Sequence, residues 1–503
     1  MERSRKVVVI GSGIGGAGIA ALLQTRGHQV TLLEKNGYYG GKCSSFVRDG
    51  YVVDSGVHMY SMGPRGPHAE LDRRVGGDLE WCVADPMSDI ISSGRVHMLA
   101  YQNQFDPRGL LENLKAVAMD RRVAREGRRD AARRMRLLEK ETYRAAKRMR
   151  PREVLDAVVR IARRDEALLT ELDGITLQEF AHRVTDDLGF LGTLATLCMV
   201  LLVVPYSEAA AGEFLWCYAS IYRNRSLGVP RGSAREIPGS FMRAFLRAGG
   251  DLRLGCEAAR IRVENGRARG VESREGEFFP AELVVSNAGI KRTLELAGEE
   301  NFPPEYAAYV RGLRYSYSFI TAKYGLARRV VDVGAPSFFN KPHVHPDHMF
   351  DYIEEDMEEG GVPEDPLLFV PMPSEWDPRV APVGKQLLIM GVPGPSEVTP
   401  ERVEQCERIL DRAEERLCEL FPAVKDGAEW IMRTHIAHTA AITGKPTGEC
   451  IGLAQCVGQT GIAKPSCRTP VEGLWLVGTD AGARGVGTEQ AAASALYLSG
   501  LLT

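Results

Sequence analysis

Apolar residues in the first 35 positions follow two different periods, one after the other. Two short apolar runs, Val7–Ile10 and Val30–Leu33, have the length and β-branched content of buried strands. The residues between them carry apolar side chains at helical spacing, at Ile19, Ala20, Leu22 and Leu23. Gly27 follows this pattern, and a glycine just past the last periodic residue is a typical helix end. The order strand, helix, strand over so short a segment predicts a parallel βαβ unit.

Glycines occupy the connection between the first strand and the helix, in the pattern G-x-G-x-x-G. The segment reads Gly11, Ser12, Gly13, Ile14, Gly15 and Gly16. Gly11 permits a tight turn, Gly13 lets the backbone approach a pyrophosphate, and Gly16 lets the helix and strand pack closely. The helix N-terminus offers free N–H groups to the phosphates. Glu34, at the end of the second strand, can accept hydrogen bonds from both ribose hydroxyls of an adenosine, so the unit predicts dinucleotide binding.

The residues after Glu34 favour FAD over NAD. Lys35 follows at once, a glycine pair and a basic residue end at Gly41 and Lys42, and Asp54-Ser55-Gly56-Val57-His58 comes soon after. An NAD site needs no such extension, whereas a longer flavin lying partly under a second domain does. With these motifs the chain resembles the phytoene desaturase branch of the flavin amine oxidase superfamily, which includes carotenoid desaturases, carotenoid isomerases and retinol saturases. The resemblance implies noncovalent FAD, contacted also by Lys35, Gly41, Lys42, Gly56, Val57 and His58.

Two later stretches extend the resemblance over almost the whole chain. Strands around the hairpin signal Asn265-Gly266 lead to a buried strand that ends before Asn287. In the family this stretch returns to the FAD domain, and Ala258 matches the residue that touches adenine. The C-terminal stretch again reads strand, turn, helix, and its members matched to flavin contacts are Gly478, Asp480, Gly487 and Thr488. The resemblance implies that the last helix faces the pyrimidine end of the ring, and Asp480 can also cap a helix.

The resulting fold class is α/β, with a Rossmann-like FAD-binding domain of the glutathione reductase type interleaved with an α+β substrate domain. We expect residues 1–95, 226–300 and 433–503 to form the FAD-binding domain. Residues 96–225 should form a helical region that faces the substrate or a membrane, and residues 301–432 the sheet of the substrate domain. At 503 residues the chain is long enough for two connected domains with large cores.

The middle of the chain contains two stretches, and the sequence allows two structural interpretations of each. Basic residues outnumber acidic ones about two to one between residues 107 and 165, which is typical of a solvated helical face or of a surface that attracts anionic lipid. Leu188–Val204 is nearly unbroken apolar sequence, too short for a confident membrane span. It indicates a buried core helix, or a helix that lines an apolar tunnel or dips into lipid.

Composition and short motifs limit which binding partners the protein is expected to have and in which cell compartment it is expected to work. The net charge of -3 gives no reason to expect nucleic acid, and a second G-x-G-x-x-G for NAD(P)H is missing. Ten cysteines without a C-x-x-C pair, and no recognisable signal peptide, predict a reducing cytoplasmic setting, with peripheral membrane attachment left open. His343-Val344-His345-Pro346-Asp347-His348 has no second ligand cluster, so we expect a surface or substrate-side loop and no metal.

The resemblance predicts redox chemistry at a flavin on an elongated apolar substrate such as a polyene or isoprenoid. A hydride would move to or from flavin N5. The protein would orient the substrate, exclude water and provide charged groups, and it would need no nucleophile of its own. His435 and Lys464 are the only candidates for a direct role; Lys464 stands where the family more often has arginine, and it could equally pair with a core carboxylate. A flavin-dependent double-bond isomerase, an amine oxidase and a non-catalytic flavoprotein remain alternatives, and the electron partner is open.

Overall fold

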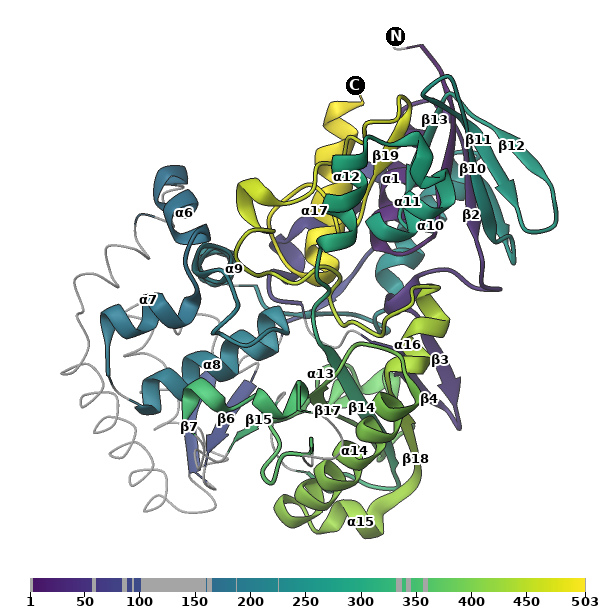
Figure 1. Ribbon diagram of the computed structural model, residues 1–503. Helices are drawn as coiled ribbons and strands as arrows, with labels where there is room; N and C mark the ends of the chain where they lie inside the picture. The colour runs from purple at the N-terminus through teal and green to yellow at the C-terminus, as the bar shows by residue number, and fades with distance from the viewer. Residues whose placement is uncertain are drawn as a thin grey trace.

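A five-stranded parallel sheet forms one half of the molecule (Figure 1). The computed structural model describes residues 3–56, 60–83, 88–92, 95–100, 160, 165–186, 188–224, 226–331, 337–340, 345–355 and 361–502. The strand order is β19-β13-β1-β2-β9. The strands are β1 (Lys6–Ile10), β2 (Gln29–Glu34), β9 (Asp251–Leu254), β13 (Leu283–Ser286) and β19 (Leu474–Leu476). Strands from the start, middle and end of the chain thus lie side by side, as a doubly wound cofactor domain requires.

Helices cover one face of this sheet and a small sheet covers the other. α1 (Ile14–Thr25) packs against α2 (Pro67–Val75), α10 (Glu236–Arg247) and α17 (Gly487–Leu501). The antiparallel sheet β10 (Ala258–Glu264), β11 (Arg267–Ser273) and β12 (Phe278–Pro280) packs on β13 through β11. The predicted hairpin is confirmed, since Asn265 and Gly266 both have positive φ, as a type I′ turn needs. α11 (Ile290–Ala297) and α12 (Pro304–Gly312) follow β13.

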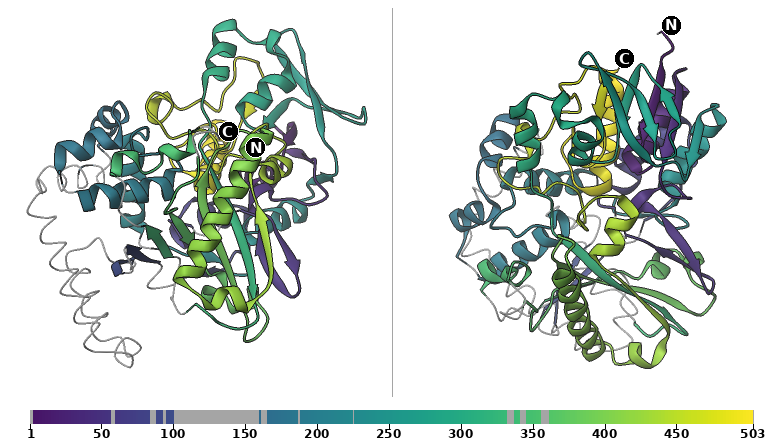
Figure 2. Two further views of the ribbon diagram at one scale, coloured as in Figure 1. Left: turned by 60° about the horizontal axis from the view of Figure 1, so that its bottom comes forward. Right: turned by 45° about the vertical axis from the view of Figure 1, so that its right-hand side comes forward.

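A seven-stranded mixed sheet forms the other half, in the order β18-β14-β17-β16-β15-β6-β7. Its strands are β6 (Ser88–Ser92), β7 (Arg95–Ala100), β14 (Ser318–Leu326), β15 (Ser337–Asn340), β16 (Leu368–Val370), β17 (Gln386–Gly394) and β18 (Ala428–Thr434). The long helix α14 (Pro400–Leu420) packs on β14 and β17, as Figure 2 also shows. The domain boundary expected at residue 95 falls inside the β6–β7 hairpin, and both strands belong to the seven-stranded sheet. The sequence did not predict this, because β6 pairs with β15, which lies almost 250 residues later, and no local pattern indicates that pairing.

Four helices form the described part of the helical region: α6 (Glu166–Asp173), α7 (Leu177–Val184), α8 (Leu188–Leu202) and α9 (Ala211–Asn224). α8 contributes Leu191, Ala195, Cys198, Met199 and Leu202 to the core shared with the seven-stranded sheet. This agrees with the buried-core reading of the apolar stretch. None of the helices that the structure describes has the length and apolar character needed to cross a membrane. The Arg-rich stretch lies outside the described residues, apart from residues 160 and 165.

The remaining elements are short. They are β3 (Ser45–Arg48), β4 (Tyr51–Asp54), β5 (Trp81–Cys82), β8 (Val229–Pro230), α13 (Pro373–Trp376), α15 (Ala423–Gly427) and α16 (Ile436–Thr443). α16 matters for the site, because it connects β18 of the second sheet to the segment that returns to the parallel sheet.

Candidate functional site

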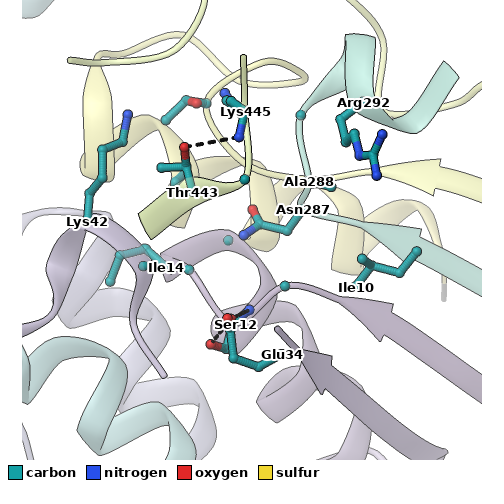
Figure 3. A pocket seen from close by; sticks show the side chains of 18 of the residues that line it. Ile10, Ser12, Ile14, Glu34, Lys42, Asn287, Ala288, Arg292, Thr443 and Lys445 are labelled. Atoms are coloured by element: carbon teal, nitrogen blue, oxygen red, sulfur yellow. Dashed lines mark hydrogen bonds between the residues drawn. The ribbon is translucent and has the colours of Figure 1, made fainter. Parts of the chain in front are cut away.

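A cavity of about 1100 Å³, part of it open to solvent, lies at the carboxyl ends of β1, β2 and β13 (Figure 3). Ligands of open α/β sheets bind at this edge. Of the residues predicted to bind the cofactor, these line it: Gly11, Ser12, Gly13, Ile14, Gly15, Glu34, Lys35, Gly41, Lys42, Ala258, Asn287, Asp480 and Thr488. Segments more than 450 residues apart in the chain therefore meet at one cavity.

The turn before α1 has the geometry of an anion site. Gly11 has φ +85°, and a Cβ on Gly16 would lie 1.9 Å from the carbonyl oxygen of Gly11. The first hydrogen bond of α1 runs from Ala17 N–H to Gly13 O at 2.8 Å. The N–H groups of residues 14–16 therefore have no partner in the helix ladder and point out of its first turn. Such a turn, lining a cavity, binds phosphate groups.

Asn287 lies against three of the glycines, as its position beside the turn in Figure 3 illustrates. A Cβ on Gly13, Gly15 or Gly478 would come within 2.5–2.8 Å of the Asn287 side-chain amide. A Cβ on Gly15 would also lie 2.8 Å from the Cα of Gly478. Gly478 does not line the cavity; it lets α1, β13 and the end of β19 approach one another. Sequence reasoning placed Asn287 in the site through the resemblance alone.

Glu34 is buried and already has four donors within the protein. Its Oε2 accepts from the N–H of Ser12 at 2.9 Å and from Ser12 Oγ at 2.5 Å. Its Oε1 accepts from the N–H of Asn36 at 2.8 Å and from Asn36 Nδ2 at 2.9 Å. Glu34 therefore also fixes the glycine turn, and a ribose hydroxyl would share a carboxylate oxygen with one of these side chains or replace it.

A chain of alternating charges borders the cavity opposite the glycine turn. Asp480 lies 3.5 Å from Lys445 Nζ, which donates to Glu449 Oε1 at 2.9 Å, and Lys42 Nζ lies 3.5 Å from the same oxygen. Asp480 also accepts the N–H of Ile290 at 3.1 Å, at the start of α11, so the helix-cap role holds. Burial would lower the pKa of Lys445, but Asp480 and Glu449 outweigh it and raise that pKa. Burial opposes ionisation of Glu449 too, yet Lys445 and Lys42 lower its pKa, so Glu449 and Lys445 both stay charged.

Lys445 and its neighbours were missed by sequence reasoning. The end of α16 and the following turn, residues 442–445, line the cavity. The signal is weak, a Gly-Lys-Pro-Thr-Gly run with no known spacing, and only the fold brings it to the parallel sheet.

The N-terminus of α17 reaches the cavity at Thr488. Gly487, which begins this helix with φ +54°, and Gly56 do not line it. A Cβ on Gly56 would lie 2.8 Å from the carbonyl oxygen of Lys42, so Gly56 packs behind that residue. Val57 and His58 lie outside the described residues.

Neither candidate for a direct role lines the cavity. The ring of His435, at the start of α16, lies 4.2 Å from the ring of His438 and 3.5 Å from Glu407. Lys464 is buried, donates to Gln455 Oε1 at 3.1 Å and lies 3.9 Å from Glu213. Burial lowers the pKa of Lys464. Its contacts match the alternative in which it pairs with a core carboxylate.

Comparisons with known proteins agree with this architecture. The family described as the NAD(P)-binding Rossmann-like domain matches residues 9–71. The chain is 28% identical over 501 residues to the zeta-carotene-forming phytoene desaturase of Myxococcus xanthus, covering 95% of this chain and 90% of that protein. It is 23% identical over 520 residues to the all-trans-retinol 13,14-reductase of Danio rerio, covering 94% and 82% respectively. An oxidoreductase from Methanosarcina mazei has a similar fold, with a TM-score of 0.67 at 22% identity over 98% of this chain and 99% of that one.

These likenesses run across both sheets and are not confined to the βαβ unit. The desaturase and the reductase both match more than nine-tenths of the chain. A nucleotide-binding unit grafted onto an unrelated protein would match only its first part. Over nearly its whole length the chain is thus similar to proteins named phytoene desaturase and retinol reductase, and it shares its fold with an oxidoreductase.

Proposed function

We propose that the cavity holds FAD noncovalently and that the chain oxidises or reduces carbon–carbon bonds of an elongated apolar substrate of the polyene or isoprenoid type. The observation that carries the proposal is the meeting of the glycine turn, Asn287 and the α17 N-terminus at one cavity, in a chain whose full-length relatives are named for polyene and retinoid chemistry. When bound, FAD supplies a ring that accepts or donates a hydride.

The lining residues suit the parts of FAD in order. Glu34 and Ala258 suit the adenosine, because a carboxylate accepts ribose hydroxyls and a small side chain leaves room for a flat base. The free N–H groups at the start of α1 suit the pyrophosphate. Lys42 and the N-terminus of α17 suit the ring end, because both present positive charge to an electron-rich edge. These assignments for individual residues are part of the proposal.

The apolar substrate class is supported by the relatives, one of which is named for phytoene and the other for retinol. A long hydrocarbon of this kind gains binding free energy by leaving water for apolar surroundings. The relatives differ in the direction of their reactions, since one is named a desaturase and the other a reductase, so the proposal includes both directions.

The test begins with the cofactor. Purified protein should be yellow and should release FAD, not FMN, on acid denaturation. Gly13→Ala puts a Cβ 2.8 Å from Asn287 Nδ2 and should lower the bound flavin, whereas Gly37→Ala, whose Cβ meets nothing within 4 Å, should not. Folded wild-type protein that takes up no FAD on reconstitution would contradict the proposal.

The reaction class is then read from anaerobic flavin spectra. Polyenes, quinones and NAD(P)H are added separately to the flavin-loaded protein. Bleaching by a saturated or partly saturated isoprenoid identifies a desaturase, and bleaching by NAD(P)H followed by reoxidation with a polyene identifies a saturase. Turnover of a cis polyene without net oxidation identifies an isomerase. If only amines bleach the flavin, the proposed substrate class is wrong and the protein is an amine oxidase.

We also propose contact with a membrane surface, supported by the basic excess at residues 107–165 and by an apolar substrate that partitions into lipid. Binding to anionic vesicles should fall as salt rises, because screening weakens the attraction. If the protein binds neither anionic nor neutral vesicles, the membrane proposal is wrong and the alternative interpretation of residues 107–165, a solvated helical face, is favoured.

A further inference from the structure

Four charged side chains lie buried where the helical region meets the last segment of the parallel-sheet domain. This buried charge cluster consists of Asp173 at the end of α6, Glu213 in the first turn of α9, Lys464, and Arg484 in the turn before α17. The side chains are 7%, 0%, 3% and 15% exposed respectively. Two negative and two positive charges balance, and all four are removed from water at a considerable cost in free energy.

The contacts inside the cluster are specific. Both terminal nitrogens of Arg484 donate to the Asp173 carboxylate, at 3.0 and 2.5 Å. Nη1 of Arg484 also donates to Glu213 Oε2 at 3.1 Å. Burial alone would lower the pKa of Arg484, but the two carboxylates raise it, so the guanidinium stays charged. A two-pronged pair with a second carboxylate on one prong fixes orientation as well as distance.

The surrounding backbone leaves room for this arrangement. A Cβ on Gly212 would lie 2.3 Å from one oxygen of Asp173, and a Cβ on Gly461 would lie 1.8 Å from the other. Two glycines from different segments therefore accommodate one carboxylate. Apolar residues of similar volume would pack such a junction at lower cost, so the cluster points to a role in holding a particular geometry.

The cluster holds the backbone of the turn that leads into α17. Oε1 of Glu213 accepts the N–H of Gly485 at 2.7 Å, and Lys464 donates to the carbonyl oxygen of Ala483 at 3.4 Å. α17 begins two residues after Gly485, and its second residue, Thr488, lines the cofactor cavity. The direction in which the α17 N-terminus points thus depends on a side chain of α9.

We propose that Glu213, with Arg484 and Asp173, is a positioning residue for the ring end of the cofactor site, and that it couples helices α6 and α9 to the N-terminus of α17. The inference rests on the proposed function for the identity of the cofactor. Coupling between two sites is reciprocal, so cofactor binding should also stabilise α9 at its first turn. A substrate that shifts α9 changes the surroundings of the flavin ring through the same carboxylate.

The test compares Glu213→Gln with a matched control elsewhere. A glutamine has one accepting oxygen, which cannot serve Gly485, Arg484 and Lys464 together, and its amide nitrogen would face a cation. The control is Asp377→Asn, because Asp377 is likewise buried, accepts the N–H of Gly232 at 2.7 Å and pairs with Arg379 through two nitrogens, away from the cavity. Hydrogen exchange is followed by mass spectrometry in the flavin-free proteins, and FAD affinity by titration.

In Glu213→Gln, peptides that cover residues 483–488 should exchange about tenfold faster, and the FAD dissociation constant should rise about tenfold with a changed visible circular dichroism of the flavin. The control should exchange faster only around residues 232 and 379, whose N–H groups Asp377 accepts, and should bind FAD within about twofold of wild type. If Glu213→Gln does not fold, Asp173→Asn replaces it with the same two measurements, because it weakens the two-pronged pair that holds Arg484 and should also speed exchange at residues 483–488.

Unchanged exchange at residues 483–488 in a folded variant overturns the inference, whether or not FAD binds. Faster exchange with unchanged FAD affinity and an unchanged flavin spectrum also overturns it, because the turn would then be held for stability alone. Failure of the wild-type protein to bind FAD refutes the proposed function instead, and the exchange measurement still decides whether the cluster holds the turn.

Discussion

Replacing Lys323 by methionine should change how the stability of the protein depends on pH. Lys323 lies fully buried in β14, the second strand of the seven-stranded sheet, and donates from Nζ to Thr434 Oγ1 at 2.8 Å, Thr321 Oγ1 at 3.1 Å and the carbonyl oxygen of Ser55 at 3.4 Å. All three acceptors are neutral, and in the described residues no carboxylate lies within 4.0 Å of Nζ. Burial lowers the pKa of Lys323 from 10.5 to about 8, and Asp54 offsets only part of this effect.

The magnitude follows from the difference between the two pKa values. At about 1.4 kcal/mol for each pH unit, the charged form costs about 3 kcal/mol in the folded protein. The folded state holds this proton more weakly than the unfolded state, so the penalty is fully present below pH 8 and disappears as the pH rises to 10.5. Between pH 7 and pH 10 the contribution of Lys323 should therefore become more favourable by about 2.5 kcal/mol.

The assay is urea unfolding of the wild type and Lys323→Met at pH 7 and pH 10, both saturated with FAD. Methionine fills a similar volume and does not titrate, so its advantage over the wild type should shrink by about 2.5 kcal/mol over this range. The exposed Lys425→Met serves as the control and should show no such change. A difference between Lys323→Met and wild type that stays constant within about 0.5 kcal/mol would refute the reasoning, because the buried amine would then not titrate in this range.

Two further predictions concern the cofactor cavity. Glu34→Gln should weaken FAD binding by about 1.5–3 kcal/mol in a titration, and should also lower the melting temperature of the flavin-free protein, because Ser12 and Asn36 lose a charged acceptor; an unchanged dissociation constant would remove Glu34 from the site. Asp480→Asn should reduce bound flavin while the far-ultraviolet circular dichroism stays native, because it loses the ion pair with Lys445 but can still cap α11; full flavin content would confine Asp480 to the helix cap.

The parts of the fold that the sequence predicts well are those whose signals are local. β1, α1 and β2 follow from two apolar runs, a helical period and glycines whose φ or lack of Cβ the turn requires. The Asn265-Gly266 hairpin is local in the same sense, because two consecutive positive φ values favour few residue types. Most of the predicted cofactor contacts therefore line the cavity, since they come from such segments or from a family pattern built on them.

The parts that could not be predicted depend on contacts between distant segments. The pairing of β6 with β15, the position of Lys445 and the second role of Glu34 leave no periodicity or spacing behind. Glu213 looks like an ordinary helix-start acid, because an acidic residue in a first turn is common in exposed helices. Only the fold shows that this carboxylate is 0% exposed and holds a turn some 270 residues further along the chain.

The electrostatic potential at the end of the cavity proposed for the flavin ring depends on which nearby positive charges lack a carboxylate partner. For Lys464 the sequence left open a direct role at the flavin or a pair with a core carboxylate, and its charge faces Glu213. Lys42 and Lys445 do border the cavity, but both lie within 3.5 Å of Glu449, which reduces their field at the ring. Glu489, the acidic residue in the first turn of α17, does not line the cavity and accepts from Ser61 Oγ and from the N–H of Met62 instead. The helix dipole would then add positive potential at a bound flavin ring, and we expect a change in the orientation of α17, such as the loss of Glu213 would cause, to shift the reduction potential of the flavin.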